Sequence, residues 1–189
     1  MPESQSVDPG RPAVFLDRDG VLNVDHHYVH QPERFEWIPG AMEAVRWLNQ
    51  QGYLVIVVTN QSGVARGYFP ESSVHDLHAW VDRQLASQEA HVDAYYYCPH
   101  HPEGSVPEYT KTCNCRKPAP GMILQALSEW SVDISRSYLV GDSPRDVEAA
   151  ESAGIRGYLF TGGNLLDTMR TLVADLGGQT IAGTDNGKF

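Results

Sequence analysis

The chain has 189 residues, of which 41% are hydrophobic, and this is enough for one domain of ordinary size with its own core. Its formal net charge of −10 repels nucleic acids and anionic membranes, so neither is expected as a partner. No apolar run is long enough to span a bilayer, and residues 1–11 lack the basic and then apolar order of a signal peptide. We therefore expect a cytoplasmic protein that starts with a flexible leader, residues 1–11.

Predicted strands and helices alternate along the chain. Short apolar runs predict buried strands, and stretches with apolar residues at helical spacing lie between them. In chain order, the elements are a strand at Ala13–Leu16, a helix opened by Pro39–Gly40 and ended by Gly52, a strand at Tyr53–Val58, a helix at Ser72–Gln88, a strand at Ala94–Tyr97, a helix at Gly121–Trp130, a strand at Tyr138–Val140, a helix at Pro144–Ala153, a strand at Tyr158–Phe160 and a helix at Leu165–Leu176.

This alternation predicts a three-layer, Rossmann-like α/β fold, in which a parallel sheet has helices on both faces. A single domain would span residues 12–176, followed by a loose, Gly-rich tail at residues 177–189. The gaps between the motifs described below are filled by the predicted elements, so we expect no large cap domain.

Two carboxylates follow the first predicted strand, where ligands bind in parallel sheets of this kind. Asp17 can bind a metal and attack phosphorus, while Asp19 can protonate a leaving oxygen and later activate water. Gly20 lets the chain turn away sharply. A lone Asp-x-Asp is more often a solvated acidic turn, so this motif does not decide the function by itself.

Three later motifs favour phosphate chemistry. Thr59, after the second strand, can hold phosphate oxygens, and Lys117 can neutralise charge on a transferred phosphate. Asp142, after the fourth strand, can complete a Mg²⁺ shell of oxygen ligands, and Asp146 can orient Lys117 or hold metal-bound water. Taken singly, these residues also fit a helix cap, a surface lysine and a helix N-terminal acid.

The order of these motifs and their placement after strands resemble the haloacid dehalogenase superfamily of phosphatases over residues 13–161. The resemblance implies an aspartyl-phosphate intermediate on Asp17, a general acid/base at Asp19, and phosphate ligands at Thr59 and Lys117. It also implies magnesium held by Asp17, the main-chain carbonyl of Asp19 and Asp142.

A second group of metal ligands lies on the Pro- and Gly-rich loop that spans residues 98–115. Three thiols and one imidazole satisfy a tetrahedral structural zinc site, and they are Cys98, His100, Cys113 and Cys115. His101 is the alternative fourth ligand, and loose thiols beside surface histidines are the alternative to a metal site. An odd number of cysteines argues against a disulfide framework. Zinc would fold the loop and direct Arg116 and Lys117, which follow it.

Within the superfamily, several segments resemble the D-glycero-D-manno-heptose 1,7-bisphosphate 7-phosphatases. These segments are residues 15–20, 23–26, 28–30, 59–67, 96–102 and 113–121. The resemblance implies removal of the 7-phosphate in ADP- or GDP-heptose and lipopolysaccharide precursor synthesis. It also implies substrate contacts from Asp25, His26, His27, Tyr28, Asn60, Gln61, Ser62 and Arg116. The open site suits a small phosphorylated sugar, and we expect a monomer.

The chain departs from the family pattern at one position, because members carry a Lys directly after the Asp of the fourth motif, where this chain has Ser143. A histidinol-phosphate phosphatase is the nearest alternative, although residues 23–28 match the heptose type. A nucleic-acid end phosphatase is disfavoured by the charge of −10. A zinc-stabilised binding module without catalysis is disfavoured by the intact set of Asp17, Asp19, Lys117 and Asp142.

Overall fold

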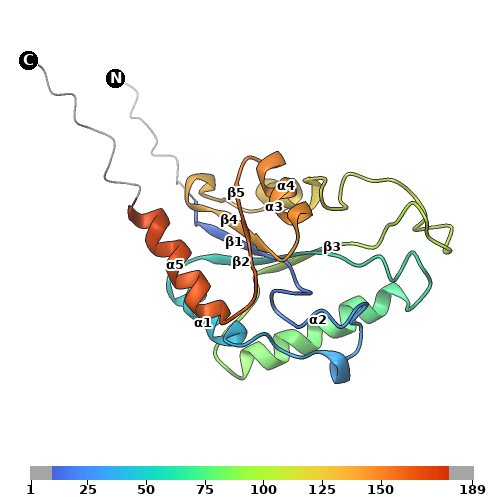
Figure 1. Cartoon of the computed structure of the whole chain (residues 1–189), viewed down its shortest axis with the longest axis horizontal. Coiled ribbons are helices and arrows are strands. Elements are labelled where there is room, and N and C mark those ends of the chain that lie inside the picture. Colours follow the sequence, from blue (N-terminus) through green and yellow to red (C-terminus); the bar gives the residue numbers. More distant parts are fainter. Residues whose placement is uncertain (1–9, 179–189) are drawn as a thin grey trace, which may run out of the picture.

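The core of the molecule is a five-stranded parallel sheet (Figure 1). The structure is a computed structural model that describes residues 10–178. The strands are β1 (Ala13–Leu16), β2 (Leu54–Asn60), β3 (Ala94–Cys98), β4 (Tyr138–Gly141) and β5 (Arg156–Leu159), and they pair in the order β3-β2-β1-β4-β5. The predicted α/β class and the parallel sheet are therefore confirmed.

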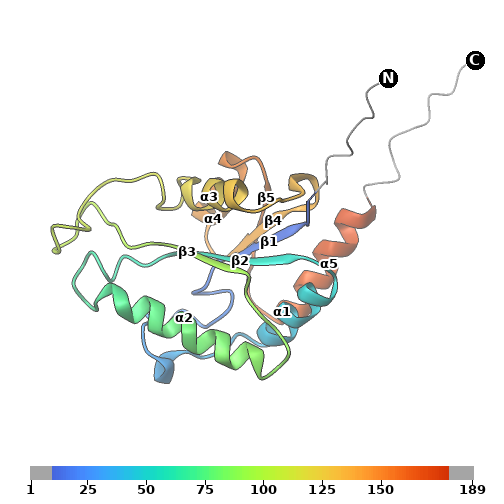
Figure 2. The same ribbon diagram turned by 180° about the vertical axis from the view of Figure 1, so that it is seen from behind.

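Helices cover both faces of the sheet (Figures 1 and 2). One face packs against α1 (Ala41–Gln50), α2 (Glu71–Ala86) and α5 (Leu165–Gly178), and the other packs against α3 (Gly121–Glu129) and α4 (Pro144–Ser152). Short 3-10 helices lie at Pro32–Arg34 and Ile134–Arg136. Because neighbouring strand residues point to opposite faces, Val14 and Leu16 join the first core while Ala13 and Phe15 join the second.

The observed boundaries move three motif residues into strands. Strand β2 runs on to Asn60 and includes Thr59, and β4 includes Gly141, so the hydrogen-bonded sheet reaches the site itself. Strand β5 begins two residues before the predicted Tyr158. It lies at the edge of the sheet and its residues are only partly buried or exposed, so its apolar pattern was a weak guide to its start.

The predicted leader and tail fall largely on residues 1–9 and 179–189, which lie outside the described residues. Arg11 is part of the fold, because its amide N donates to Ser131 O (3.0 Å) and its carbonyl accepts from Asp133 N (2.9 Å). Residues 177 and 178 belong to the last turn of α5. Between residues 10 and 178, no cap domain interrupts the order of strands and helices, and none of the helices could cross a membrane.

The long loop between β3 and α3 packs against the segment that follows β2. The amides of Ser105 and Val106 donate to Ala65 O at 2.7 and 2.9 Å, and Ser105 Oγ donates to Arg66 O at 2.8 Å. In both ribbon views, this loop extends beyond the sheet on the side of the carboxyl ends of the strands (Figures 1 and 2). It therefore forms one wall of the region where the predicted motifs meet.

Candidate active site

The carboxyl ends of β1 and β4 bring the first and the fourth motif together. Asp17 directly follows β1, and Asp142 directly follows β4, its neighbour in the sheet. Gly20 permits their approach, because a Cβ built on this residue would lie 2.0 Å from Asp142 Oδ2. Its φ of +87° is also one that side chains rarely tolerate. A glycine at position 20 is thus required on two grounds.

Lys117 is the central cation of the site. Its Nζ lies 3.0 Å from Asp17 Oδ2 and 2.6 Å from Asp146 Oδ1, and it donates to Val58 O at 2.8 Å. Burial by itself would lower the pKa of Lys117, but the two carboxylates outweigh it and hold this pKa above its usual value. Lys117 therefore remains charged between Asp17 and Asp146, although it is buried.

Asp17 has the opposite electrostatic balance. Burial raises the pKa of Asp17 to about 7, Lys117 opposes this shift, and the charges of Asp146 and Asp19 add to it. Its Oδ1 accepts from the amide of Arg18 at 2.7 Å. An additional cation beside Asp17 would favour the carboxylate, which is the form that can attack phosphorus.

The Asn60 side chain makes two hydrogen bonds to the backbone of Lys117. Its Nδ2 donates to Lys117 O at 3.1 Å, and its Oδ1 accepts from Lys117 N at 3.0 Å. Asn60 was predicted to contact the substrate, but both polar atoms of its side chain are bonded to the Lys117 backbone. This geometry positions Lys117 across 57 residues of sequence.

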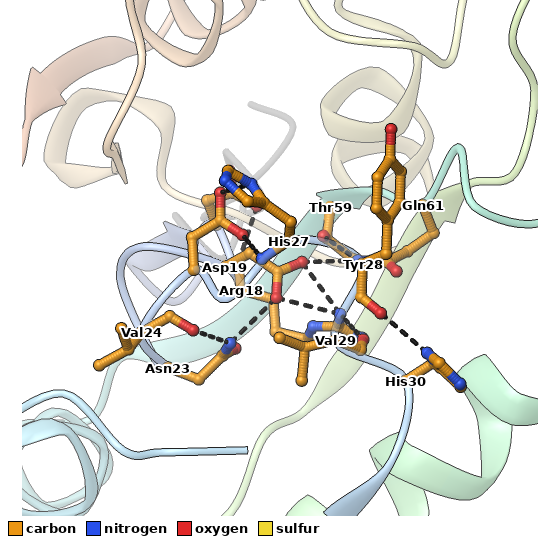
Figure 3. Close-up of polar contacts among 12 residues, drawn as sticks. Arg18, Asp19, Asn23, Val24, His27, Tyr28, Val29, His30, Thr59 and Gln61 are labelled. Atoms are coloured by element: carbon orange, nitrogen blue, oxygen red, sulfur yellow. Dashed lines mark hydrogen bonds and ion pairs between the residues drawn. The ribbon is translucent and has the colours of Figure 1, made fainter. Parts of the chain in front are cut away.

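Asp19 is surrounded by donors (Figure 3). Arg18 Nη2 lies 3.1 and 2.9 Å from its two oxygens, Asn23 Nδ2 donates to Oδ1 at 3.0 Å, and Gln61 Nε2 donates to Oδ2 at 2.9 Å. The same Gln61 nitrogen also donates to Thr59 Oγ1 at 3.0 Å. These bonds hold the Asp19 carboxylate in one orientation at the floor of the site.

Arg18 also connects Asp19 with the loop that contains residues 25–30. Its Nη2 donates to Val29 O at 2.6 Å (Figure 3). The Arg18 side chain is almost completely buried. In that loop, His27 and Tyr28 have φ values of 58° and 54°, and His27 N donates to Asp25 Oδ1 at 2.8 Å. Positive φ at two residues that are not glycine is strained backbone of the kind that gathers at binding sites.

A polar cavity of about 440 Å³ joins these groups. It is lined by Asp17, Asp19, Asp25, His27, Tyr28, Thr59, Asn60, Gln61, Ser62, Gly63, Arg116, Lys117, Asp142, Ser143 and Arg145. Every predicted catalytic residue and almost every predicted substrate contact is in this lining. His26 is outside it and pairs instead with Glu36 at 2.8 Å on the neighbouring surface. Asp146 is fully buried behind Lys117.

The donor set at the cavity floor fits magnesium. Carboxylate oxygens of Asp17, Asp142 and Asp146 lie within 4.8 Å of one another. Asp146 already contacts Lys117 and accepts from Ser143 N at 3.0 Å, so Asp17 and Asp142 have the more available oxygens. Four carboxylates and two cations lie at the cavity floor, and their formal charges sum to −2, which a divalent ion would neutralise. The carboxylates are Asp17, Asp19, Asp142 and Asp146, and the cations are Arg18 and Lys117.

The loop cysteines fit zinc. Their sulfurs lie 3.2–3.5 Å apart, and His100 Nδ1 lies 3.3 Å from Cys115 Sγ and 3.8 Å from Cys98 Sγ. Tetrahedral zinc with Zn–S bonds of about 2.3 Å places its ligand atoms roughly 3.8 Å apart. The imidazole beside the three sulfurs is that of His100, whereas His101 Nε2 contacts Arg66 at 3.1 Å. The predicted Cys₃His set therefore comes together.

Several residues in or beside the site were not singled out from the sequence, among them Arg18, Asn23, Glu71 and Arg145. Arg18 could have been noticed, because a charged residue between Asp17 and Asp19 at the end of a buried strand needs an acidic partner if it is itself buried. Asn23 and Glu71 had no such signal. Glu71 accepts from Tyr97 Oη and Tyr109 Oη, both at 2.8 Å, and so ties the zinc loop to the start of α2.

Comparisons with known proteins agree with this geometry. A family model described as HAD-hydrolase-like matches residues 114–178. A D-glycero-β-D-manno-heptose-1,7-bisphosphate 7-phosphatase of Rhodopseudomonas palustris is 53% identical over 154 residues, covering 82% of this chain and 86% of the relative. The chain belongs to this phosphatase family. A member from Escherichia coli K12 is 50% identical over 144 residues, covering 76% of this chain and 75% of its own length.

Solved structures support the same family assignment. A D,D-heptose 1,7-bisphosphate phosphatase from B. bronchiseptica, complexed with magnesium and phosphate, is 34% identical with a TM-score of 0.73. The match covers 89% of this chain and 98% of that structure. A HAD-like phosphatase from Mesorhizobium loti has a TM-score of 0.80 at 34% identity, covering 97% of this chain and 92% of the other. The heptose-bisphosphate phosphatase family thus matches this chain in sequence and in fold.

Proposed function

We propose that this chain hydrolyses the 7-phosphate of D-glycero-β-D-manno-heptose 1,7-bisphosphate through an aspartyl-phosphate on Asp17. The relatives in this family are named for that activity and that anomer. The observation that carries the proposal is the position of Lys117 Nζ, 3.0 Å from Asp17 and 2.6 Å from Asp146 at the floor of a polar cavity. A charged amine beside a nucleophilic carboxylate is suited to phosphoryl transfer.

The phosphate to be removed would lie against Asp17, Thr59 and Lys117. Because Thr59 Oγ1 accepts from Gln61 Nε2, the hydroxyl hydrogen of Thr59 is available to a phosphate oxygen. Lys117 Nζ donates to Val58 O and to two carboxylates, which fix the direction of its charge. The site would therefore hold the phosphate in line with Asp17 before any bond changes.

In the first half-reaction, an oxygen of Asp17 attacks phosphorus, the bond from phosphorus to the sugar O7 breaks, and Asp19 gives its proton to O7. In the second, Asp19 takes a proton from water as the water oxygen attacks phosphorus, and the bond to Asp17 breaks to release inorganic phosphate. The donors from Arg18, Asn23 and Gln61 keep Asp19 facing the reacting atoms through both halves.

Magnesium would be held by Asp17, Asp142 and the main-chain carbonyl of Asp19. When bound, it lowers the charge repulsion between a phosphate and the attacking carboxylate. Burial and the charges of Asp146 and Asp25 raise the pKa of Asp142. A cation bound beside Asp142 would stabilise its charged form. Zinc at Cys98, His100, Cys113 and Cys115 would have a structural role, because this set leaves no position for substrate.

The sugar would occupy the outer part of the cavity. Asp25, His27, Tyr28 and Ser62 line that part and offer hydrogen-bond partners to hydroxyl groups. Arg116 lines it as well and would contact the second phosphate. A cavity of about 440 Å³ is within the size range of small-molecule sites.

Residues 12–176 would work as one phosphatase domain, extended in the structure by Arg11 and the end of α5. We infer that a monomer is active. Three cysteines that form no disulfide are consistent with a reducing compartment, and we place the protein in the cytoplasm, where lipopolysaccharide precursors are made.

Phosphorus NMR of the reaction tests this function. The wild-type protein with Mg²⁺ is expected to release inorganic phosphate from the β-bisphosphate and to leave the C1 phosphate on the sugar. The α anomer and histidinol phosphate are expected to react more slowly, and EDTA is expected to stop the reaction. Faster release from histidinol phosphate, or no release from any of these esters with Mg²⁺ present, would contradict the proposal.

A further inference from the structure

Two arginines line the cavity and a third contacts the zinc loop, all without an acidic partner. Arg116 and Arg145 are in the cavity lining, and Arg66 Nη2 lies 3.1 Å from His101 Nε2. Among residues 10–178, no carboxylate comes within 4.0 Å of any of the three. In a chain with 24 acidic and 14 basic residues, such a group of unpaired cations is unexpected. It marks a place where an anion would bind.

The positive charges of this group also act on one another. Arg116 and Arg145 line the same polar cavity, so their guanidinium charges face one shared space. Like charges this close destabilise the free site, and an anion placed between Arg116 and Arg145 would relieve the repulsion. The geometry therefore favours a ligand with a concentrated negative charge over a neutral sugar hydroxyl.

Ser143 holds Arg145 at the edge of the cavity. Arg145 Nε donates to Ser143 Oγ at 3.0 Å, while Ser143 N donates to Asp146 Oδ2 at 3.0 Å. The turn that presents Asp142 and Asp146 to the reacting centre thus also presents Arg145 to the outer cavity. Because the Nε contact orients the side chain, both terminal nitrogens of the guanidinium remain for a ligand.

The remaining cation in the cavity is already engaged. Lys117 Nζ contacts two carboxylates and one carbonyl, so all three of its N–H donors are engaged at the floor of the site and none is left for a second phosphate. Within residues 10–178, the Arg116 side chain makes only a long contact, from Nη1 to His100 O at 3.4 Å, and the Arg145 side chain bonds only to Ser143. These two guanidiniums therefore hold the free donors with which a second phosphate can be recognised.

We propose that Arg145, oriented by the Ser143 hydroxyl, is a specificity-determining residue that binds, together with Arg116, the phosphate that stays on the product. This inference rests on the proposed function, because it requires a substrate with two phosphates. A guanidinium can donate two parallel hydrogen bonds to one phosphate, and two guanidiniums can surround it. Since the product keeps this phosphate, Arg145 also contributes to product binding.

Kinetics on paired substrates test the inference. Wild type and Arg145→Ala are compared on the heptose 1,7-bisphosphate and on heptose 7-phosphate, which lacks the second phosphate. We expect Arg145→Ala to lower kcat/KM for the bisphosphate about ten- to hundredfold, mainly through KM, as a charge-assisted contact predicts. For heptose 7-phosphate the change should stay below about twofold. Ser143→Ala should cause a smaller loss on the bisphosphate alone.

Two further variants separate binding from general charge effects. Arg83→Ala removes the same charge from an exposed position on α2 and should leave both substrates unaffected. Arg145→Lys keeps a positive charge but not the two-pronged geometry, and it should recover part of the loss. Product inhibition by heptose 1-phosphate should weaken in Arg145→Ala by the same factor as the rise in KM.

The outcomes distinguish this inference from the function on which it rests. If wild type hydrolyses the bisphosphate but Arg145→Ala behaves like Arg83→Ala, Arg145 is a solvated surface residue and the inference is wrong. Equal losses on both substrates would place Arg145 at the transferred phosphate, which also overturns it. If wild type hydrolyses neither heptose phosphate, the proposed function fails first, and the inference fails with it.

Discussion

Asn60 allows a sharp test of how the site is built, because its side chain bonds both the N–H and the C=O of Lys117. Asn60→Ala removes both hydrogen bonds and leaves the peptide of a buried lysine without them. Two hydrogen bonds at about 0.5–1.5 kcal/mol each amount to roughly 1–3 kcal/mol of folding free energy. For a domain of this size, that corresponds to a fall in Tm of roughly 2–12 °C.

The kinetic effect should appear in kcat. If Asn60 positions Lys117, its loss displaces the charge that stabilises the transferred phosphate, and kcat should fall about ten- to hundredfold with KM changed less than about threefold. Activity with the heptose bisphosphate and thermal unfolding, each followed with Mg²⁺ present, measure the two effects. A raised KM with normal kcat and normal Tm would show that Asn60 contacts the substrate instead, and would refute this reasoning.

The chain contains a matched control for this experiment. Asn49, at the end of α1, makes the same pair of bonds to the peptide of His91, from Nδ2 to the carbonyl at 3.2 Å and from the amide to Oδ1 at 2.9 Å. Asn49→Ala therefore removes an equivalent pair far from the cavity. It should lower Tm by no more than Asn60→Ala does, because this pair is more exposed, and it should leave kcat unchanged.

Three other perturbations have defined outcomes. Asp19→Asn should lower kcat about 10²–10⁴-fold, as expected for loss of a general acid/base, and it should also lower the Tm, because it removes the carboxylate partner of the buried Arg18. Elemental analysis should find one zinc per chain in protein prepared without added metal, and Cys115→Ser should lose it; metal-free protein with three freely reactive thiols would exclude the site. Burial lowers the pKa of His78 to about 3, so this residue destabilises the fold as pH falls from about 6.5 towards 3. At pH 5 it should cost about 2 kcal/mol relative to pH 8, a loss that urea unfolding of His78→Gln should not show.

Most of the fold follows from local pattern. The run at residues 54–58 is apolar at every position and becomes a strand buried on both faces, because helices cover both sides of the sheet. The start of β5 could not be predicted as well, since an edge strand packs less of its surface and its residues show a weaker apolar signal. The helix boundaries differ from prediction by one or two residues, where propensity is weak.

Some residues of the site could likewise be predicted from the sequence, and others could not. Asp17, Asp142 and Lys117 could be predicted to meet because each lies at or beyond the end of a strand or just before a helix, and parallel topology brings these ends together. The pairing of Asn60 with Lys117 could not be predicted, because it joins backbone and side chain across 57 residues without a sequence pattern. The position of Arg145 at the cavity could not be predicted either, because nothing in the sequence distinguishes it from an ordinary surface arginine.

Identification of the phosphorylated residue tests the central claim most directly. Protein mixed with excess bisphosphate labelled at the C7 phosphate would be quenched in acid within the first turnover and digested, and the labelled peptide sequenced by mass spectrometry. Our account predicts phosphate on Asp17, hydroxylamine-sensitive as an acyl phosphate should be, and no label in Asp17→Asn. Rapid product formation by wild type with no labelled peptide, or with label on a different residue, would contradict it.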